Sequence, residues 1–291
     1  MITSQFEQPL TLLPKQYEAA HLQFSSGVHD NKLEVLNHFV PHTLAEQNTA
    51  ALMNRMDSKY LLPMSFFNNF MESLVYDYSI LNTDNHRIFN YQTTYFDTKK
   101  KQFYLDHHNG KLNRYKIRFR RYVESNKGFM EVKFKNNKKR TIKQRIPMDC
   151  TLPNQNRINE FVKESLGYST KLETALFVNY HRITLLNLRN LERITIDLNL
   201  SFRNALDQTQ SIQDKVFIVE IKQENRQLAS PCSQLLKING YQDINFSKYC
   251  MGTILTNSRS TSRSTSSNVY KLKQNRFKPI IKKLNHLNSL N

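Results

Sequence analysis

Alternating apolar and charged residues dominate the middle of the chain. In the run RYKIRFRR, a period of two places Lys116, Arg118 and Arg120 on one face and Ile117 and Phe119 on the other. The runs FMEVKFK and TIKQRI continue this period, and the turn-forming stretches SNKG and NNKK separate the three runs. The pattern predicts a three-stranded antiparallel meander with one apolar and one densely cationic face.

The cationic face has two interpretations. It is either the solvated exterior of a sheet, where Lys and Arg serve solubility, or the inner face of a closed barrel. Cations that line a barrel repel one another, and that repulsion is tolerable only if a polyanion is the intended occupant.

The same segregation recurs along much of the chain. The segments RMDSKYLLP, FVNYHRITLL, ERITIDLNLSF and VFIVEIKQ each alternate polar or charged residues with apolar ones, and NFSK at 245–248 is predicted as a further strand. Every apolar face needs a cover, which predicted helices with a single apolar stripe can supply. This recurrence favours the inward interpretation, a cationic tunnel with helices packed on the outside.

Two predicted helices illustrate this cover. The first covers residues 65–78, with Ser65 as its expected N-cap. The second covers residues 156–167, with Gly167 as its expected C-cap. A short helix before Gly110 would leave His107 and His108 at the surface.

Charge and composition restrict the partners. The 291 residues carry 42 Lys and Arg against 24 Asp and Glu, a formal charge of +18, so an anionic partner is expected. Six glycines form neither a Walker loop nor a dinucleotide motif, so side chains must bind any phosphate. Three cysteines without paired spacing indicate a reducing compartment. Without a signal peptide or an apolar run of about 18 residues, a soluble, cytoplasmic protein is expected.

The chain divides into three expected parts. Residues 1–30 are a loose N-terminal arm, residues 31–254 form the tunnel domain, and residues 255–291 are a low-complexity linker followed by a basic tail. The tail is either a short helix that contacts a partner or an anionic surface, or a free extension.

Several motifs, taken together and in order, carry a family resemblance. They are RMDSKYLL, YFDT, NGKLNRYKIRFRRY, FMEVKFK, RTIKQRI, YHRITL, ERITIDLNL, FIVEIKQ and FSKYCMG. Over roughly residues 33–252 the chain resembles the VTC catalytic domain of polyphosphate polymerases, a branch of the CYTH-like triphosphate tunnel metalloenzymes. The resemblance implies an α+β fold with an antiparallel eight-stranded β-barrel. It also implies transfer of the terminal phosphate of ATP to a polyphosphate chain with a divalent metal, Mn²⁺ or Mg²⁺.

The resemblance also implies roles for individual residues. Arg118, Arg120 and Glu220 correspond to the catalytic positions, and Glu220 is the expected metal ligand. Glu131 and Asp197 either assist the metal or pair with neighbouring cations. The expected phosphate-binding residues are Lys59, Lys133, Lys143, Arg182, Arg193 and Lys248.

Rival hypotheses remain open. A tunnel triphosphatase would use the same cations, but the chain has few inward acids and carries RMDSK where that class has ExExK. A non-catalytic module that binds polyphosphate or another anionic ligand is a third hypothesis. Specific nucleic-acid binding is not expected, because aromatic residues fall mainly on the apolar faces. The basic tail suggests a membrane-associated partner protein and a location peripheral to the membrane.

Overall fold

The computed structural model describes residues 33–49, 56–138, 140–150, 154–187, 189, 191–212, 215–224, 230–257 and 272–289. The expected N-terminal arm, Arg55 and most of the low-complexity linker lie outside these ranges.

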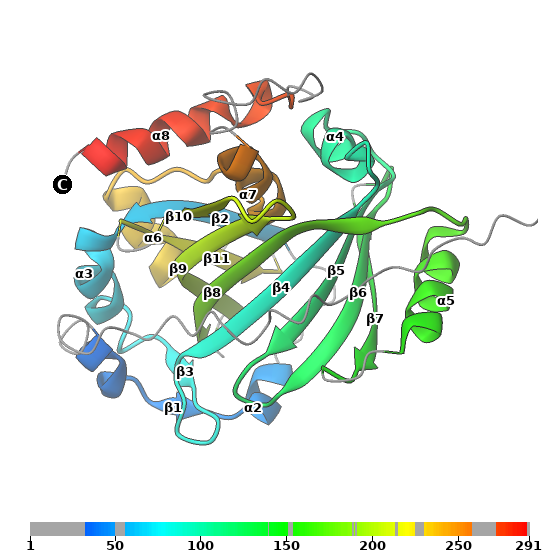
Figure 1. Cartoon of the computed structure of the whole chain (residues 1–291). Helices are drawn as coiled ribbons and strands as arrows, with labels where there is room; N and C mark the ends of the chain where they lie inside the picture. Colours follow the sequence, from blue (N-terminus) through cyan, green and yellow to red (C-terminus); the bar gives the residue numbers. More distant parts are fainter. Residues whose placement is uncertain are drawn as a thin grey trace, which may run out of the picture.

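A single large sheet organises the chain. Its main path is antiparallel and runs in the order β2, β11, β9, β8, β4, β5, β6 and β7 (Figure 1). The strands of this path are β2 (Met56–Pro63), β4 (Phe89–Asp97), β5 (Arg114–Tyr122), β6 (Lys127–Lys135), β7 (Thr141–Met148), β8 (Glu173–Asn187), β9 (Glu192–Asn204) and β11 (Val216–Gln223). Short strands β1 (Pro41–His42), β3 (Ser79–Leu81) and β10 (Thr209–Ser211) join at the margins. The predicted cationic meander is confirmed as β5, β6 and β7.

The sheet is not closed into a barrel, which corrects the closed eight-stranded expectation. The path ends at β2 and β7, and these two strands do not pair over the residues that the structure describes. Strand β7 is largely exposed and carries Lys143 and Arg145, and charged edge strands resist further pairing. The edge of β2 is instead met by an irregular segment, because the Ile244 N–H donates to the Lys59 carbonyl at 2.7 Å.

This irregular segment also replaces the strand predicted at 245–248. Its residues have no regular structure until helix α7 (Lys248–Asn257) begins. The Lys116 Nζ of β5 donates to the Ser247 Oγ at 3.2 Å. The segment therefore links the edge of β2 to β5, an interior strand of the path, and not to the other end of the path at β7.

Helices cover the outer, apolar face as the alternation predicts. The 3₁₀ helix η1 (Glu34–His38), helix α3 (Phe67–Glu72) and helix α6 (Pro231–Ile238) pack on β9 and β11 around Phe217 and Ile196. Helix α5 (Gln155–Leu166) packs on β5 and β6 around Ile117 and Val132, and it ends at Gly167 with a φ of 77°, as predicted. Each buried Leu, Ile or Phe side chain contributes about 1.5–3 kcal/mol to this packing.

Helix α7 packs on the inner face, contrary to the expectation that every helix lies outside. Its residues Met251 and Ile254 share a buried cluster with Leu176 of β8 and Phe202 of β9. A bulge makes this possible, because Asn199, at a φ of 52°, breaks the pairing register between β8 and β9. The extra residue turns Leu200 and Phe202 to the face that carries Asp197 earlier in the same strand.

The remaining helices differ in detail from the predictions. The helix predicted over 65–78 is a 3₁₀ turn, η2 (Met64–Phe66), followed by the short α3, and Ser65 does not cap it. His107 and His108 lie in α4 (Gln102–His108) and are buried, because Phe277 of the C-terminal segment packs against both imidazole rings. The longest described helices, α5 and α8 (Lys278–Ser289), have 12 residues each, and no described helix could cross a bilayer. The remaining short elements are α2 (Leu44–Thr49) and η4 (Asn275–Phe277).

Replacement of Gly252 in α7 by Ala tests the inner packing. Gly to Ala in a helix normally stabilises by about 0.4–1 kcal/mol. In this helix a Cβ would lie 2.4 Å from the Phe202 Cδ1 and 2.6 Å from the Leu176 Cδ2. We therefore expect Gly252→Ala to lower the free energy of unfolding by about 1–3 kcal/mol in urea denaturation. Glu164→Ala on the exposed side of α5 is the control, and a stabilised Gly252→Ala would contradict the inner position of α7.

Candidate functional site

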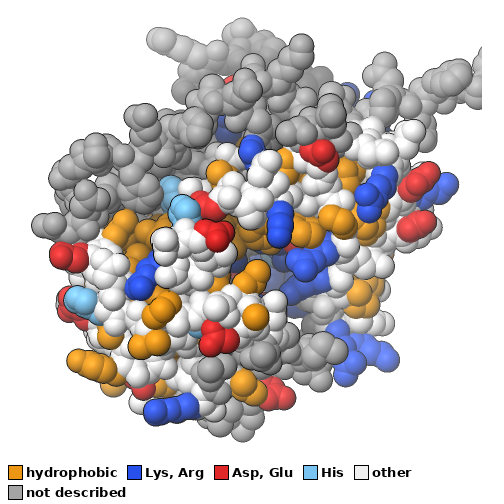
Figure 2. Space-filling model, turned by 90° about the horizontal axis from the view of Figure 1, so that it is seen from below, with side chains coloured by type: hydrophobic (Ala, Val, Ile, Leu, Met, Phe, Trp, Pro, Cys, Tyr) orange, Lys and Arg blue, Asp and Glu red, His pale blue; other side chains and the backbone are white. Residues whose placement is uncertain are grey.

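The inner face of the sheet gathers the charged residues that the alternation predicted. Cross-strand pairs place like charges side by side, with Lys133 of β6 directly opposite both Lys116 of β5 and Lys143 of β7. Figure 2 shows Lys and Arg side chains in a hollow on one face of the molecule. Directly opposed like charges destabilise a sheet, so this arrangement carries a cost when no anion is bound.

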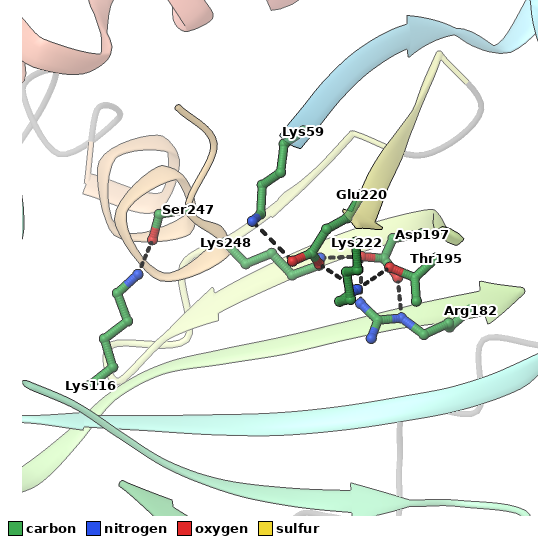
Figure 3. Close-up of polar contacts among 9 residues, drawn as sticks. All are labelled: Lys59, Lys116, Arg182, Thr195, Asp197, Glu220, Lys222, Ser247 and Lys248. Carbon is green, nitrogen blue, oxygen red and sulfur yellow. Dashed lines mark hydrogen bonds and ion pairs between the residues drawn. The ribbon is translucent and has the colours of Figure 1, made fainter. Parts of the chain in front are cut away.

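Glu220 of β11 lies at the centre of one charged group, beside its cross-strand neighbour Lys59 of β2. One carboxylate oxygen of Glu220 is 3.1 Å from the Lys59 Nζ and the other is 3.3 Å from the Lys222 Nζ (Figure 3). Burial alone would raise the pKa of Glu220, but Lys222 and Lys59 hold that pKa well below its ordinary value. Glu220 therefore stays ionised with both oxygens engaged.

Asp197 of β9 forms the second acidic position of this group. The Arg182 Nε and Nη2 donate to its two carboxylate oxygens at 2.6 and 2.9 Å, and Lys248 at the start of α7 pairs with the same carboxylate (Figure 3). Burial opposes ionisation, but Arg182 and Lys248 lower the pKa of Asp197 to about 2. Asp197 thus holds two expected phosphate-binding residues from separate elements in one place.

Arg118, Glu131 and Lys133 form a second charged group on β5 and β6. Glu131 lies directly opposite Arg118 and forms an ion pair with it, and the nearby cations overcome burial and lower the pKa of Glu131 to about 2. Lys133 forms no ion pair within 4.0 Å in the described part of the chain. Burial, followed by the charges of Arg118 and Arg120, keeps its pKa well below the ordinary value for Lys.

The two remaining predicted residues lie at the margins of the inner face. Lys143 is exposed on the edge strand β7, next to Lys133, and Arg193 is half-buried on β9, opposite Lys222. The fold therefore brings Lys59, Glu220, Arg182 and Lys248 together, and places Arg118, Arg120, Lys133 and Lys143 on the facing strands of the same surface.

The sequence motifs did not assign Lys116 or Lys222 to the site, although both obey the alternation that selected their neighbours. Lys222 donates to the Thr195 Oγ1 at 3.1 Å, and burial lowers its pKa to about 7 although Glu220 opposes this. The aromatic residues Tyr91 and Tyr180 were given no role either, although the alternation of FVNYHRITLL places Tyr180 with Arg182. Their rings lie on the charged face beside Arg120 and Arg182. Their position two residues from inward-facing neighbours was the available signal.

The residues present fit a metal ion only in one way. No group of three or more His, Cys, Asp or Glu side chains that could hold a metal occurs among the described residues. Three inward carboxylates, Glu220, Asp197 and Glu131, are each paired with cations, and a fourth, Asp57, lies opposite Lys222 on the edge strand β2. Mg²⁺ in phosphoryl-transfer sites needs only one or two carboxylates because substrate phosphates supply further oxygens. The site thus fits a divalent ion that arrives with a triphosphate and does not form a metal cage of its own.

A small cavity of about 360 Å³ opens beside the Glu220 group. It is lined by Asp57 and Lys59 of β2 and by residues 243–246 of the irregular segment that leads to α7. It reaches only one edge of the inner face, so the distribution of charged side chains locates the site better than this cavity does.

Fold and site define an α+β protein whose curved antiparallel sheet presents a cationic inner surface suited to a polyanion. The model of the VTC domain family matches residues 54–257. The chain belongs to the VTC domain family. A comparison with curated protein sequences gave no match.

Solved structures resemble the chain only distantly. A candidate adenylyl cyclase from Hippeastrum, described as having a dominant triphosphatase activity, is 12% identical, with 68% of this chain and 95% of that chain covered at a TM-score of 0.43. A candidate adenylate cyclase from Vibrio parahaemolyticus is 10% identical, with 66% and 94% covered at a TM-score of 0.40. At such TM-scores these likenesses carry no argument about the function of this chain.

Replacement of Lys133 by Met tests the cost of the crowded cations. Removing a buried charge without an ion pair should raise the free energy of unfolding at pH 7 by about 1–2 kcal/mol, in the lower part of the usual range because Lys133 is partly exposed. The pKa of Lys133 is lower in the folded chain than the value of about 10.4 in an unfolded one. The unfolded chain therefore binds more protons, and wild-type stability should rise with pH towards that value more than variant stability does.

Urea denaturation at pH 7 and pH 9 measures both effects. Lys163→Met on the exposed side of α5 is the matched control. A destabilised Lys133→Met at pH 7 would mean that Lys133 is not under electrostatic strain.

Proposed function

We propose that this chain is a polyphosphate polymerase-like phosphotransferase that moves the γ-phosphate of ATP onto a polyphosphate chain. Membership of the VTC domain family supports this proposal. The observation that carries it is the imbalance on the inner face. The three acids at the centre of that face, Glu220, Asp197 and Glu131, are each paired, whereas the cation Lys133 has no ion pair within 4.0 Å over the described ranges.

The chemistry of the surface suits phosphoryl transfer. Such transfer requires the donor and acceptor phosphates to be held in line and the charge on the transferring oxygens to be offset, with little covalent assistance. Arg118, Arg120 and Arg182 can each bind phosphate in a bidentate manner, whereas Lys133 and Lys143 act as movable point charges. The attacking group is a terminal oxygen of phosphate or polyphosphate, so no Ser, Cys or His nucleophile is required.

Glu220 would hold the divalent ion, Mn²⁺ or Mg²⁺, together with phosphate oxygens. When bound, the ion would supply additional positive charge against the phosphate oxygens. Lys59 and Lys222 occupy the two oxygens of Glu220 in this structure, and both ammonium groups could also pair with phosphate oxygens. These lysines thus keep Glu220 ionised before the substrate arrives.

A tunnel triphosphatase is the second candidate and ranks lower. Hydrolysis requires a water molecule to be positioned and activated, for which an unpaired carboxylate is the usual base. The pairing of Glu220, Asp197 and Glu131 argues against such a base at the centre of the inner face, and Asp57 lies exposed at the margin on the edge strand β2. A non-catalytic module that binds polyphosphate or another anion would need the same cations and differs only in the outcome of an activity assay.

The basic C-terminal helix α8 is the part of the chain that we expect a membrane-associated partner protein to contact. Its apolar residues Ile280 and Leu284 are buried against the fold, while Lys278 and Lys282 are exposed. Only the polar side of α8 is therefore available, and binding to a membrane-associated partner stays a prediction.

An activity assay separates the three candidates. Purified protein with ATP and Mn²⁺ should produce long polyphosphate, visible on a gel and degraded by a polyphosphate-specific phosphatase. Release of free phosphate alone would establish the triphosphatase instead. If neither product forms while tripolyphosphate raises the melting temperature, the protein is a binding module; a hundredfold excess over Kd stabilises by about 2.7 kcal/mol.

Glu220→Gln tests the role of the central carboxylate. The substitution preserves shape but removes the charge, so polymer synthesis should fall at least a hundredfold while the circular dichroism spectrum stays unchanged. Glu160→Gln, at an exposed position of α5, is the matched control and should retain full activity. An active Glu220→Gln variant would show that the metal is held elsewhere.

A further inference from the structure

Tyr91 of β4 lies between the two charged groups and contacts both. The Arg120 Cζ, from β5, is 5.2 Å from the centroid of the Tyr91 ring, and the Arg182 Cζ, from β8, is 5.0 Å from it. Strand β4 lies between β5 and β8, so these guanidinium groups approach one ring from opposite sides of the strand. The negative faces of aromatic rings attract cations, so Tyr91 offsets part of the repulsion between the two arginines.

A second ring extends this support. Tyr180 of β8 lies directly opposite Tyr91 and stacks on it, with centroids 5.2 Å apart and ring planes 20° apart. Tyr180 also lies near cations, because its centroid is 5.3 Å from the Arg182 Cζ and 4.6 Å from the Lys248 Nζ. The stacked rings of Tyr91 and Tyr180, here called the aromatic floor, thus lie against positive charges from β5, β8 and the start of α7.

Three polar groups beside the aromatic floor have no hydrogen-bond partner among the described residues. They are the Thr93 Oγ1, the Arg120 Nε and the Tyr180 Oη. Their residues are only 2%, 8% and 3% exposed, respectively. Thr93 lies directly opposite Arg120 in the β4 and β5 pair, two residues from Tyr91. Buried polar groups are nearly always hydrogen-bonded, so three neighbouring unpartnered donors indicate an acceptor that binds there.

We propose that one phosphate group of a triphosphate or polyphosphate binds above the Tyr91 and Tyr180 rings, between Arg120 and Arg182. Its oxygens accept hydrogen bonds from the Thr93 and Tyr180 hydroxyls and from the Arg120 Nε. A phosphate group fits because it presents several oxygens in different directions to donors that come from three strands. This inference rests on the proposed function and adds Thr93 as a phosphate-binding residue and Tyr91 as a positioning residue.

The position of this phosphate site gives it a specific role. Arg182 belongs to the group around Glu220 and Asp197, and Arg120 follows Arg118 on the strand that faces Glu131 and Lys133. A phosphate held by both arginines connects the two groups, so a bound chain runs continuously across β4. Single phosphate ions should therefore depend on this site less than tripolyphosphate does.

Calorimetric titration with tripolyphosphate, without ATP or turnover, tests the site. Thr93→Val replaces the hydroxyl by a methyl group of equal size and should weaken binding about three- to tenfold, the usual effect of one lost hydrogen bond. Thr93→Ser keeps the hydroxyl and should bind as the wild type does. Tyr91→Phe keeps the ring and should also bind normally, whereas Tyr91→Leu should weaken binding about tenfold. Thr209→Val, at an exposed position of β10, is the matched control.

The outcomes separate this inference from the proposed function. If wild-type protein does not bind tripolyphosphate, the proposed function fails. If wild-type protein binds it and both Thr93→Val and Tyr91→Leu bind it equally tightly, the phosphate site above Tyr91 is disproved. Thermal denaturation of each unliganded variant checks folding, and the pair of Thr93 variants decides the matter if Tyr91→Leu is unstable.

Discussion

Repulsion among partly buried cations is the constraint on which the rest of this structure depends. Lys116, Lys133 and Lys143 stand in one row across three strands, and each added positive charge on the inner face raises the cost of folding. The fold tolerates this row in two ways. Carboxylates are interspersed where cations from different strands meet, and large apolar clusters lie against the outer face of the same strands. Apolar packing at the periphery thus maintains a surface that is unfavourable by itself.

The inner face is divided between an apolar and a charged environment. Helix α7 fills the part above β8 and β9 with apolar side chains, while no described residue of β5, β6 or β7 belongs to that apolar cluster. The bulge at Asn199 creates this division within a single strand, since Asp197 and Phe202 face the same side although their positions differ by five, an odd number. Low-dielectric packing beside the charges strengthens every electrostatic interaction at their boundary.

The sequence predicted most strands and the positive charge of the inner face, because period-two alternation follows directly from strand geometry. It could not predict the position of α7, since the bulge at Asn199 reverses the alternation without any glycine to mark it. The irregular segment before Lys248 could not be predicted either. Its sequence also fits a strand, and its irregular conformation depends on contacts with β2 and β5, which are distant in the sequence. Individual site residues were selected by motif, but Tyr91 escaped notice because an aromatic residue in a strand usually indicates packing.

The irregular segment between β2 and β5 has a mechanical consequence. In a closed barrel the circumference is fixed by the number of strands and their stagger. In this chain the path is interrupted between β2 and β7. The irregular segment joins the edge of β2 to interior strands through the 2.7 Å bond from the Ile244 N–H to the Lys59 carbonyl, the 3.2 Å bond from Lys116 of β5 to Ser247 and the ion pair of Lys248 with Asp197 of β9. Breaking either hydrogen bond costs about 1 kcal/mol, whereas separating two ladder-paired strands would break several such bonds at once. The spacing between β2 and β7 is therefore held by fewer hydrogen bonds than the spacing between any two paired strands.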